Sequence, residues 1–259
     1  MINYGKQFLD QKDISAVVKV LKSNYLTQGP KVREFENSLK NFFGAKYCTV
    51  VSNGTSALHL AVLAAGWKKG DYIFTTPNSF LATSNSILYV GATPVFVDID
   101  PNTFTIDVVK LEKKIRTFKK NGKKIAGIIA TDYAGQPCDW RQLKFIGKKY
   151  NLKLINDNCH SIGSSMFGNK KYACKYADIV THSYHPVKNI TTGEGGSILT
   201  NNKKFDKKIK LLRSHGVIKK INKLPWSFEM HELGYNYRLS DINCALGLSQ
   251  LKKLNKFLS

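Results

Sequence analysis

A lysine that follows a Ser-Tyr-His-Pro turn is the most specific chemical feature of the sequence. Lys188 comes after Ser183-Tyr184-His185-Pro186-Val187, and Gly193-Glu194-Gly195-Gly196 follows shortly behind it. Glycines allow a backbone to lie close against a ligand, and a lysine amine can form an imine with an aldehyde cofactor. An ordinary exposed lysine is the alternative, and the specific sequence on both sides of Lys188 argues against it.

Asp157 is a second candidate, because it follows the apolar residues Leu154 and Ile155. A carboxylate at the end of a buried strand is costly unless it has a partner. A protonated ring nitrogen would be such a partner, and capping of the next turn is the alternative. His160 comes shortly after it, and a histidine in this place is more often a structural hydrogen-bonding residue than a catalyst.

A third candidate is the turn Gly54-Thr55-Ser56, which separates a short apolar run from a helical pattern. Free N–H groups at the start of a helix, together with hydroxyl groups, form an anion-binding site. Capping of the helix without any ligand is the alternative, since Thr and Ser are favoured there in any case.

The elements that would position these residues alternate along the chain. Short apolar or β-branched runs predict strands at residues 47–51, 72–75, 93–97, 124–131, 153–156, 177–181 and 196–200. Apolar residues at helical spacing predict helices at 13–21, 32–43, 55–65, 80–89, 108–118, 143–150 and 245–258. This alternation indicates an α/β fold with a mostly parallel sheet and helices on both faces. Ligands of such sheets bind beyond the carboxyl ends of the strands.

The charge is strongly basic, with 40 Lys+Arg against 18 Asp+Glu and a net charge of +22. Only five of the 40 are arginine, the usual residue for bidentate phosphate contacts, and the lysines are scattered in small groups. We therefore expect no nucleic-acid partner, although the positive field could attract an anionic substrate.

Five cysteines without a C-x-x-C pair predict free thiols and no zinc or other metal site. The sequence has no apolar run long enough to span a bilayer, and its first residues lack the apolar stretch of a secretory signal. We therefore expect a cytoplasmic location and no membrane partner.

Residues 183–196 closely resemble the lysine motif of the DegT/DnrJ/EryC1/StrS family of pyridoxal-phosphate-dependent sugar aminotransferases. Three other segments lie around this motif in the order that the family has: the turn at residues 54–56, the Asp157-x-x-His160 pattern and residues 234–241. The resemblance extends from Tyr4 to Leu254. It implies the α/β architecture of fold type I aminotransferases, with residues 1–244 as the large cofactor-binding domain. Residues 245–259 would begin a helix leading to a C-terminal small domain that is largely missing from this chain.

The resemblance also implies a role for each candidate. Lys188 would bind pyridoxal 5'-phosphate as an imine and move the substrate proton, while Asp157 would pair with the ring nitrogen. Phe80 would stack on the ring, with simple core packing as the alternative. The remaining cofactor residues would be Thr55, Ser56 and Ser183 at the phosphate, Gly54, His160, and Asn236 from the neighbouring subunit of a homodimer with shared active sites.

Within the family, residues 4–7, 26–30, 134–139, 211–216 and 245–250 resemble the branch that makes UDP-4-amino-4,6-dideoxy-N-acetyl-beta-L-altrosamine for pseudaminic acid. The substrates would then be glutamate and a UDP-linked 4-keto-6-deoxy-N-acetyl hexosamine. The residues implied in binding the nucleotide sugar are Tyr4, Asn24, Tyr25, Leu26, Thr27 and Gly54.

Three alternatives stay open beside this branch. The chain could be another aminotransferase of the family, acting on a dTDP- or GDP-linked 4-keto sugar, or a truncated cofactor-binding protein without activity. Enzymes of the same fold that deoxygenate sugars carry histidine in place of the lysine, so Lys188 argues against that chemistry. Three positions depart from the family pattern: Asn158-Cys159 replaces smaller residues, and Gly54 stands, as a mild change, where relatives often have Ala.

Overall fold

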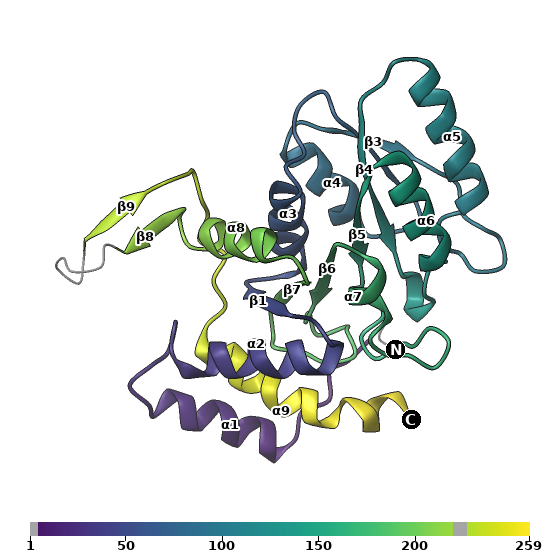
Figure 1. Cartoon of the computed structure of the whole chain (residues 1–259). Helices are drawn as coiled ribbons and strands as arrows, with labels where there is room; N and C mark the ends of the chain where they lie inside the picture. The colour runs from purple at the N-terminus through teal and green to yellow at the C-terminus, as the bar shows by residue number, and fades with distance from the viewer. Residues whose placement is uncertain (1–4, 220–226) are drawn as a thin grey trace.

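The computed structural model of the protein describes residues 5–219 and 227–259. Its centre is a seven-stranded sheet in the order β1-β7-β6-β5-β4-β2-β3 (Figure 1). The strands are β1 (Tyr47–Val51), β2 (Tyr72–Thr75), β3 (Thr93–Phe96), β4 (Ile125–Thr131), β5 (Lys153–Asp157), β6 (Ile179–Ser183) and β7 (Gly196–Thr200). Within this sheet β7 runs antiparallel to β1 and β6, and the other pairs are parallel. The predicted mostly parallel α/β sheet is confirmed.

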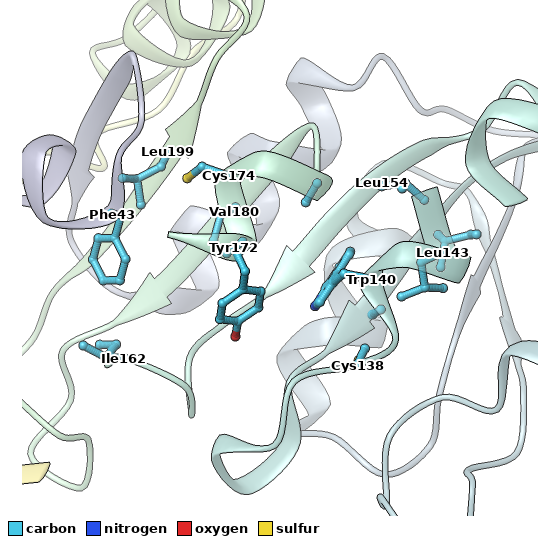
Figure 2. Close-up of a cluster of buried hydrophobic side chains, with 14 of the residues drawn as sticks. Phe43, Cys138, Trp140, Leu143, Leu154, Ile162, Tyr172, Cys174, Val180 and Leu199 are labelled. Carbon is cyan, nitrogen blue, oxygen red and sulfur yellow. The ribbon is translucent and has the colours of Figure 1, made fainter. Parts of the chain in front are cut away.

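Helices cover both faces of the sheet and enclose two separate hydrophobic clusters (Figure 1). One cluster, part of which Figure 2 shows, includes residues of α2 (Pro30–Phe43), α5 (Val108–Lys120), α6 (Trp140–Tyr150), α7 (Tyr172–Tyr176) and α9 (Asp241–Leu258). The other includes residues of α3 (Gly54–Ala64), α4 (Leu81–Tyr89) and α8 (Lys203–Arg213). Outside these layers, α1 (Gln11–Leu21) packs against α9.

The strands appear in the sequence as continuous apolar runs because both of their faces are buried. In β4, Ile128 joins the cluster beneath α5 and α6, while Ile129 joins the cluster beneath α3 and α4. Side chains alternate between the two faces along a strand. At the end of β5 this alternation separates Asn156 from Asp157, and the two side chains have different surroundings.

Side-chain caps explain why two helices begin earlier than predicted. α1 begins at Gln11 because the Asp10 carboxylate accepts hydrogen bonds from the N–H groups of Lys12 and Asp13. α9 begins at Asp241, not at residue 245, because Ser240 accepts a hydrogen bond from the N–H of Asn243. A polar residue before an apolar run therefore sets the start in both cases.

Two helices and a hairpin are absent from the sequence-based prediction. α7 has five residues, which is too short for a helical period to be visible. α8 has five lysines among its eleven residues and only a few apolar residues at helical spacing. β8 (Val217–Lys219) and β9 (Phe228–Met230) pair in a hairpin that extends away from the sheet (Figure 1). In the part of the chain described, no helix combines the length and apolar character that crossing a membrane requires.

Candidate active site

A cavity of about 620 Å³ lies at the edge of the sheet where the parallel strands end. Because β7 is antiparallel, its first residue, Gly196, pairs with Ser183 at the end of β6 and with Val51 at the end of β1. The walls come from the ends of β4, β5 and β6, from the segments after β1, β2, β4, β5 and β6, and from one residue shortly before β7. They are Asn53, Gly54, Thr55, Leu58, Ser79, Phe80, Ala82, Thr131, Tyr133, Asp157, Cys159, His160, Ser183, His185, Val187, Lys188 and Glu194. A ligand is expected in this position in a sheet of this kind.

Lys188 and Asp157 both line this cavity. Asp157 is the last residue of β5 and is 4% exposed. Lys188 is half-buried in the turn after β6, and its N–H donates to the carbonyl of His185 at 2.9 Å. Neither side chain forms an ion pair with another of the described residues. A ligand in the cavity can therefore meet an amine and a carboxylate at once.

Two donors hold the Asp157 carboxylate. Thr83, in the first turn of α4, donates from Oγ1 to Oδ2 at 2.6 Å, and the N–H of Cys159 donates to Oδ1 at 3.3 Å. Hydrogen bonds to the charged form of a carboxylate favour that form. Each carboxylate oxygen has room for more than one donor, so the group can also accept a hydrogen bond from a protonated ring nitrogen.

A second carboxylate, that of Asp132, is fully buried on the opposite face of β5. It accepts hydrogen bonds of 2.6 to 3.0 Å from the N–H of Cys138 and from the side chains of Trp140, Asn156, Asn158 and Tyr172. Burial raises the pKa of Asp132, while these donors act in the opposite direction. Because Asn156 and Asn158 flank Asp157 in the sequence, Asp132 fixes the backbone on both sides of the cavity carboxylate.

Asn158 extends this network to His182. Its amide nitrogen donates to Asp132 and Tyr172, so its oxygen must be the acceptor for Nε2 of His182, 3.1 Å away. Nδ1 of His182 then accepts from Ser197 Oγ at 3.3 Å. Complete burial lowers the pKa of His182 to about 3, so the ring is neutral and uses both nitrogens in the network.

The start of α3 forms another wall of the cavity. Asn53 caps the helix, because its Oδ1 accepts a hydrogen bond from the N–H of Ser56 at 2.8 Å. The N–H groups of Gly54 and Thr55 have no acceptor among the described residues. With the hydroxyl groups of Thr55 and Ser183 on the same wall, they form a site suited to a phosphate group.

Glycine at two positions allows these walls to approach each other. A Cβ on residue 54 would lie 2.8 Å from Cβ of Ser183 and 3.5 Å from Sγ of Cys159. A Cβ on Gly196 would lie 2.5 Å from the carbonyl oxygen of Asn53. Glycine at residue 54 therefore has a steric reason in this structure, so that a change to alanine there would not be mild.

Phe80 lies beside the cavity with 68% of its surface exposed. Core packing, the alternative interpretation of this residue, is therefore wrong, and stacking on a ligand stays a prediction. The pKa of His160 is lowered by burial first and by the charge of Lys188 second. Burial, followed by the charge of Asp157, raises the pKa of the Cys159 thiol well above its usual range, which keeps the thiol protonated and unreactive.

Several residues assigned from the sequence do not line the cavity. The Ser56 side chain is buried, and its hydroxyl donates to Oδ1 of Asn53 at 2.6 Å. Asn236 is exposed and pairs with Ser214 through an isolated bridge. Residues 24–27 are exposed at the surface, and Tyr4 is outside the described residues. The assignments of Ser56, Asn24, Tyr25, Leu26, Thr27, Tyr4 and Asn236 stay predictions.

Sequence reasoning also missed polar residues that the structure brings into the cavity. Their common signal is position, since all come within four residues of a strand end or a strand start: Asn53, Ser79, Thr131, Tyr133, His185 and Glu194. The rule that ligands bind beyond the carboxyl ends of strands, applied to every predicted strand, would have found most of them.

The donor set fits a phosphorylated pyridine aldehyde. The start of α3 offers free N–H groups for a phosphate, Lys188 offers an amine for the aldehyde, and Asp157 offers a buried carboxylate for the ring nitrogen. Within residues 5–219 and 227–259, no three His, Cys, Asp or Glu side chains gather as metal ligands would.

Curated relatives match almost all of the chain. A UDP-4-amino-4,6-dideoxy-N-acetyl-beta-L-altrosamine transaminase of Campylobacter jejuni is 47% identical over 255 residues, which are 98% of this chain and 65% of the relative. The structure of Helicobacter pylori PseC, an aminotransferase involved in the biosynthesis of pseudoaminic acid, is 37% identical with a TM-score of 0.89. The match covers 98% of this chain and 66% of the PseC chain.

A third comparison concerns a cofactor-bound structure. The putative sugar aminotransferase Spr1654 from Streptococcus pneumoniae, in its PMP form, superimposes with a TM-score of 0.89 at 28% identity over 99% of this chain and 68% of that one. The chain thus spans about two thirds of the length of the relatives that it matches. Residues 7–259 match the DegT/DnrJ/EryC1/StrS aminotransferase family, and this protein belongs to that family.

Proposed function

We propose that the cavity binds pyridoxal 5'-phosphate and that the protein transfers an amino group to a nucleotide-linked keto sugar. The observation that carries this proposal is the presence of Lys188, Asp157 and the free N–H groups of the α3 start around one cavity. When bound, this cofactor supplies an electron sink that stabilises a carbanion next to nitrogen. The PLP and PMP forms of the related structure from Streptococcus pneumoniae support the choice of cofactor.

The residues of the chain have separate tasks in this proposal. The amine of Lys188 holds the cofactor between turnovers and then moves one proton to and from the substrate carbon. Asp157 keeps the ring nitrogen protonated. Gly54, Thr55 and Ser183 bind the phosphate, and the exposed ring of Phe80 covers one face of the cofactor. His160, neutral because of its lowered pKa, is a hydrogen-bonding neighbour of the ring.

We further propose glutamate as the amino donor and the C4 ketone of a UDP-linked 4-keto-6-deoxy-N-acetyl hexosamine as the acceptor. The product would be UDP-4-amino-4,6-dideoxy-N-acetyl-beta-L-altrosamine, a precursor of pseudaminic acid. The support is the identity of 47% and 45% to two Campylobacter jejuni transaminases and of 40% to one from Helicobacter pylori, each named for this product.

The active unit in this proposal is a cytoplasmic homodimer in which each site is completed by the partner. Two features support the shared site. Asn236 and residues 24–27 lie at the surface, outside the cavity of their own chain. Leu81, Leu88 and Tyr89 of α4, next to Phe80, are more than half exposed, with 70%, 56% and 54% of their surfaces accessible. Residues 1–244 would form the large domain, and residues 245–259 would begin the helix that leads to a smaller one.

The cofactor proposal is tested first. Wild-type protein mixed with pyridoxal phosphate should acquire the visible absorption band of a lysine-bound cofactor, and Lys188→Ala should lack it. Lys203→Ala, which removes an exposed lysine on α8, is the matched control and should behave as wild type. A band that survives in Lys188→Ala contradicts the assignment of the lysine.

The substrate proposal is tested with a panel of UDP-, dTDP- and GDP-linked 4-keto sugars and glutamate, with products read by mass spectrometry. Turnover of the UDP-linked N-acetyl sugar supports the proposal. Turnover of only a dTDP- or GDP-linked sugar would replace the substrate while keeping the reaction. Absence of turnover with all of them, despite cofactor binding, would favour a cofactor-binding protein without activity.

The shared site is tested by mixing two inactive variants. In mixed dimers of Lys188→Ala and Asn236→Ala chains, one of the two sites receives both native residues. Activity should therefore return on mixing, to at most about a quarter of the wild-type value for random pairing of the chains. A mixture that stays inactive although dimers exchange subunits argues against a contribution of Asn236 to the partner's site.

A further inference from the structure

The hydroxyl of Thr83 has only one proton to donate, and the acceptor of that proton can be assigned. Oγ1 lies 2.6 Å from Oδ2 of Asp157, and an ionised carboxylate only accepts hydrogen bonds. Thr83 therefore donates to Asp157. Thr83 is 1% exposed and Asp157 is 4% exposed, so water does not compete for this bond.

Because Thr83 donates to Asp157, its oxygen must accept from the next hydroxyl. Oγ of Ser79 lies 2.5 Å away and donates to it. The alternative acceptor for Ser79, the carbonyl of Phe80, is more distant at 3.3 Å. Ser79 in turn lies 3.2 Å from Oγ1 of Thr131, which fits a bond donated by Thr131. The three hydroxyls thus point their protons in one direction, toward Asp157.

The N-terminus of α4 also favours the ionised form of the Asp157 carboxylate. Thr83 is in the first turn of this helix, whose first turn contains no acidic residue of its own and whose N-cap makes no side-chain hydrogen bond. The N-terminus of a helix carries a partial positive charge that favours a nearby anion. Asp157, from β5, supplies that anion.

We propose that Thr83 is the positioning residue that orients and stabilises the ionised carboxylate of Asp157 for a ring nitrogen, with Ser79 and Thr131 as the hydroxyl relay behind it. Successive hydrogen bonds polarise one another when they run in one direction. This inference rests on the proposed function and deepens it, because it names the residues that keep Asp157 ready for the cofactor. Thr83 itself does not line the cavity.

The test compares two ligands that differ only at the ring nitrogen: pyridoxal phosphate and its 1-deaza analogue, in which carbon replaces that nitrogen. The dissociation constant of each is measured by titration for wild type, Thr83→Val, Thr83→Ser and Ser79→Ala. In Thr83→Val the affinity for pyridoxal phosphate should fall about tenfold, as expected when a hydrogen bond to a charged group is lost. Affinity for the deaza analogue should stay within about twofold of wild type, because Asp157 has no nitrogen to pair with.

Two variants separate this role from simple packing. Thr83→Ser keeps the donor and should bind both ligands as wild type does, while Ser79→Ala should show the same selective loss as Thr83→Val in smaller measure. Thr200→Val removes another buried hydroxyl, one that donates to the carbonyl of Asp178 and lies outside the cavity. It should leave both dissociation constants unchanged.

The outcomes distinguish this inference from the proposed function. Wild-type protein that binds neither ligand contradicts the proposed function, and the inference with it. Wild-type protein that binds pyridoxal phosphate, with equal losses for the two ligands in Thr83→Val, overturns the inference alone. If Thr83→Val does not fold, as judged by thermal unfolding, Ser79→Ala decides on the same two ligands.

Discussion

The phenol of Tyr172 donates a hydrogen bond of 2.6 Å to the carboxylate of Asp132, and both residues are buried on the face of β5 opposite the cavity. Asp132 has no cation beside it among the described residues and depends on neutral donors alone. A buried carboxylate without a cation is expensive unless such donors surround it. Its donors reach from α6 and α7 to the residues on either side of Asp157, so the wall of the cavity depends on it.

Replacing Asp132 should therefore damage the fold more than any exposed carboxylate does. Asp132→Ala leaves five buried donors without their acceptor, and the free energy of unfolding should fall by at least about 3 kcal/mol. Tyr172→Phe removes one donor and should cost about 1 kcal/mol. Urea unfolding measures both. Asp100→Ala changes a partly exposed carboxylate that also accepts backbone hydrogen bonds, and a loss as large as that of Asp132→Ala in this control would contradict the role of burial.

Stability should fall as the pH decreases below about 6.5, because of His182. Complete burial lowers the pKa of His182 in the folded protein to about 3, from an ordinary value of 6.5. Between these two pKa values the unfolded chain binds a proton at His182 that the folded chain excludes. The stabilising contribution of neutral His182 is therefore complete above the pKa of the unfolded chain and is lost on acidification. At about pH 5 the loss from this one group is about 2 kcal/mol. The pKa values of His59 and His160 are also lowered, in the same direction.

The measurement is the free energy of unfolding of wild type and His182→Gln at about pH 7.5 and about pH 5. Glutamine retains a donor and an acceptor but does not titrate. We expect the variant to be less stable than wild type at the higher pH, because glutamine fits Asn158 and Ser197 less well, and to lose less stability on acidification than wild type does. Equal losses in the two proteins would mean that His182 is not the titrating group.

The hydrophobic pattern was enough to predict the sheet and most helices, because each buried strand is an apolar run and most long helices have apolar residues at helical spacing. It could not predict α8, whose lysines outnumber its apolar residues, or α7, which is too short for a period. The antiparallel direction of β7 also escapes the pattern, because an apolar run has no direction. Only the pairing of Gly196 with Ser183 and Val51 settles it.

Motifs in the sequence mark Lys188, Asp157, Gly54 and Thr55, which the structure places around one cavity, and their roles there stay predictions. Asp132, Thr83 and Ser79 carry no such mark, since each is a common residue in an ordinary context. Their importance comes from contacts between segments far apart in the sequence, such as the bond between Thr83 and Asp157. A single sequence contains no record of such contacts.

Phe80 should affect cofactor binding without affecting stability. With 68% of its surface exposed, it buries little apolar area, and Phe80→Ala should change the free energy of unfolding by less than about 0.5 kcal/mol. Loss of the ring face should weaken binding of pyridoxal phosphate by roughly fivefold, which corresponds to a stacking contribution of about 1 kcal/mol. Phe145→Ala, at 58% exposure on α6 and outside the cavity, is the matched control and should change neither quantity. Equal affinity in Phe80→Ala and wild type would remove this residue from the cofactor site.

Gly54 and Ser183 should be coupled, because a Cβ on residue 54 would lie 2.8 Å from Cβ of Ser183. Gly54→Ala forces the start of α3 away from the end of β6, at a cost of about 1 to 3 kcal/mol in stability, and displaces the free N–H groups that would hold a phosphate. Ser183→Gly removes the atom that blocks the new methyl group. The double variant should therefore recover most of the stability lost in Gly54→Ala, and a double-mutant cycle on urea unfolding gives the coupling energy directly.

Gly5→Ala is the control for this cycle, since a Cβ there would meet Val187 only at ordinary contact distances of 3.7 Å or more. Its stability should match that of wild type. Cofactor affinity separates the two consequences of the change at residue 54: the double variant regains the packing but still lacks the Ser183 hydroxyl, so it should bind pyridoxal phosphate more weakly than wild type. Additive losses of stability in the cycle would show that residues 54 and 183 do not press on each other, and the steric reason for glycine at this position would then be wrong.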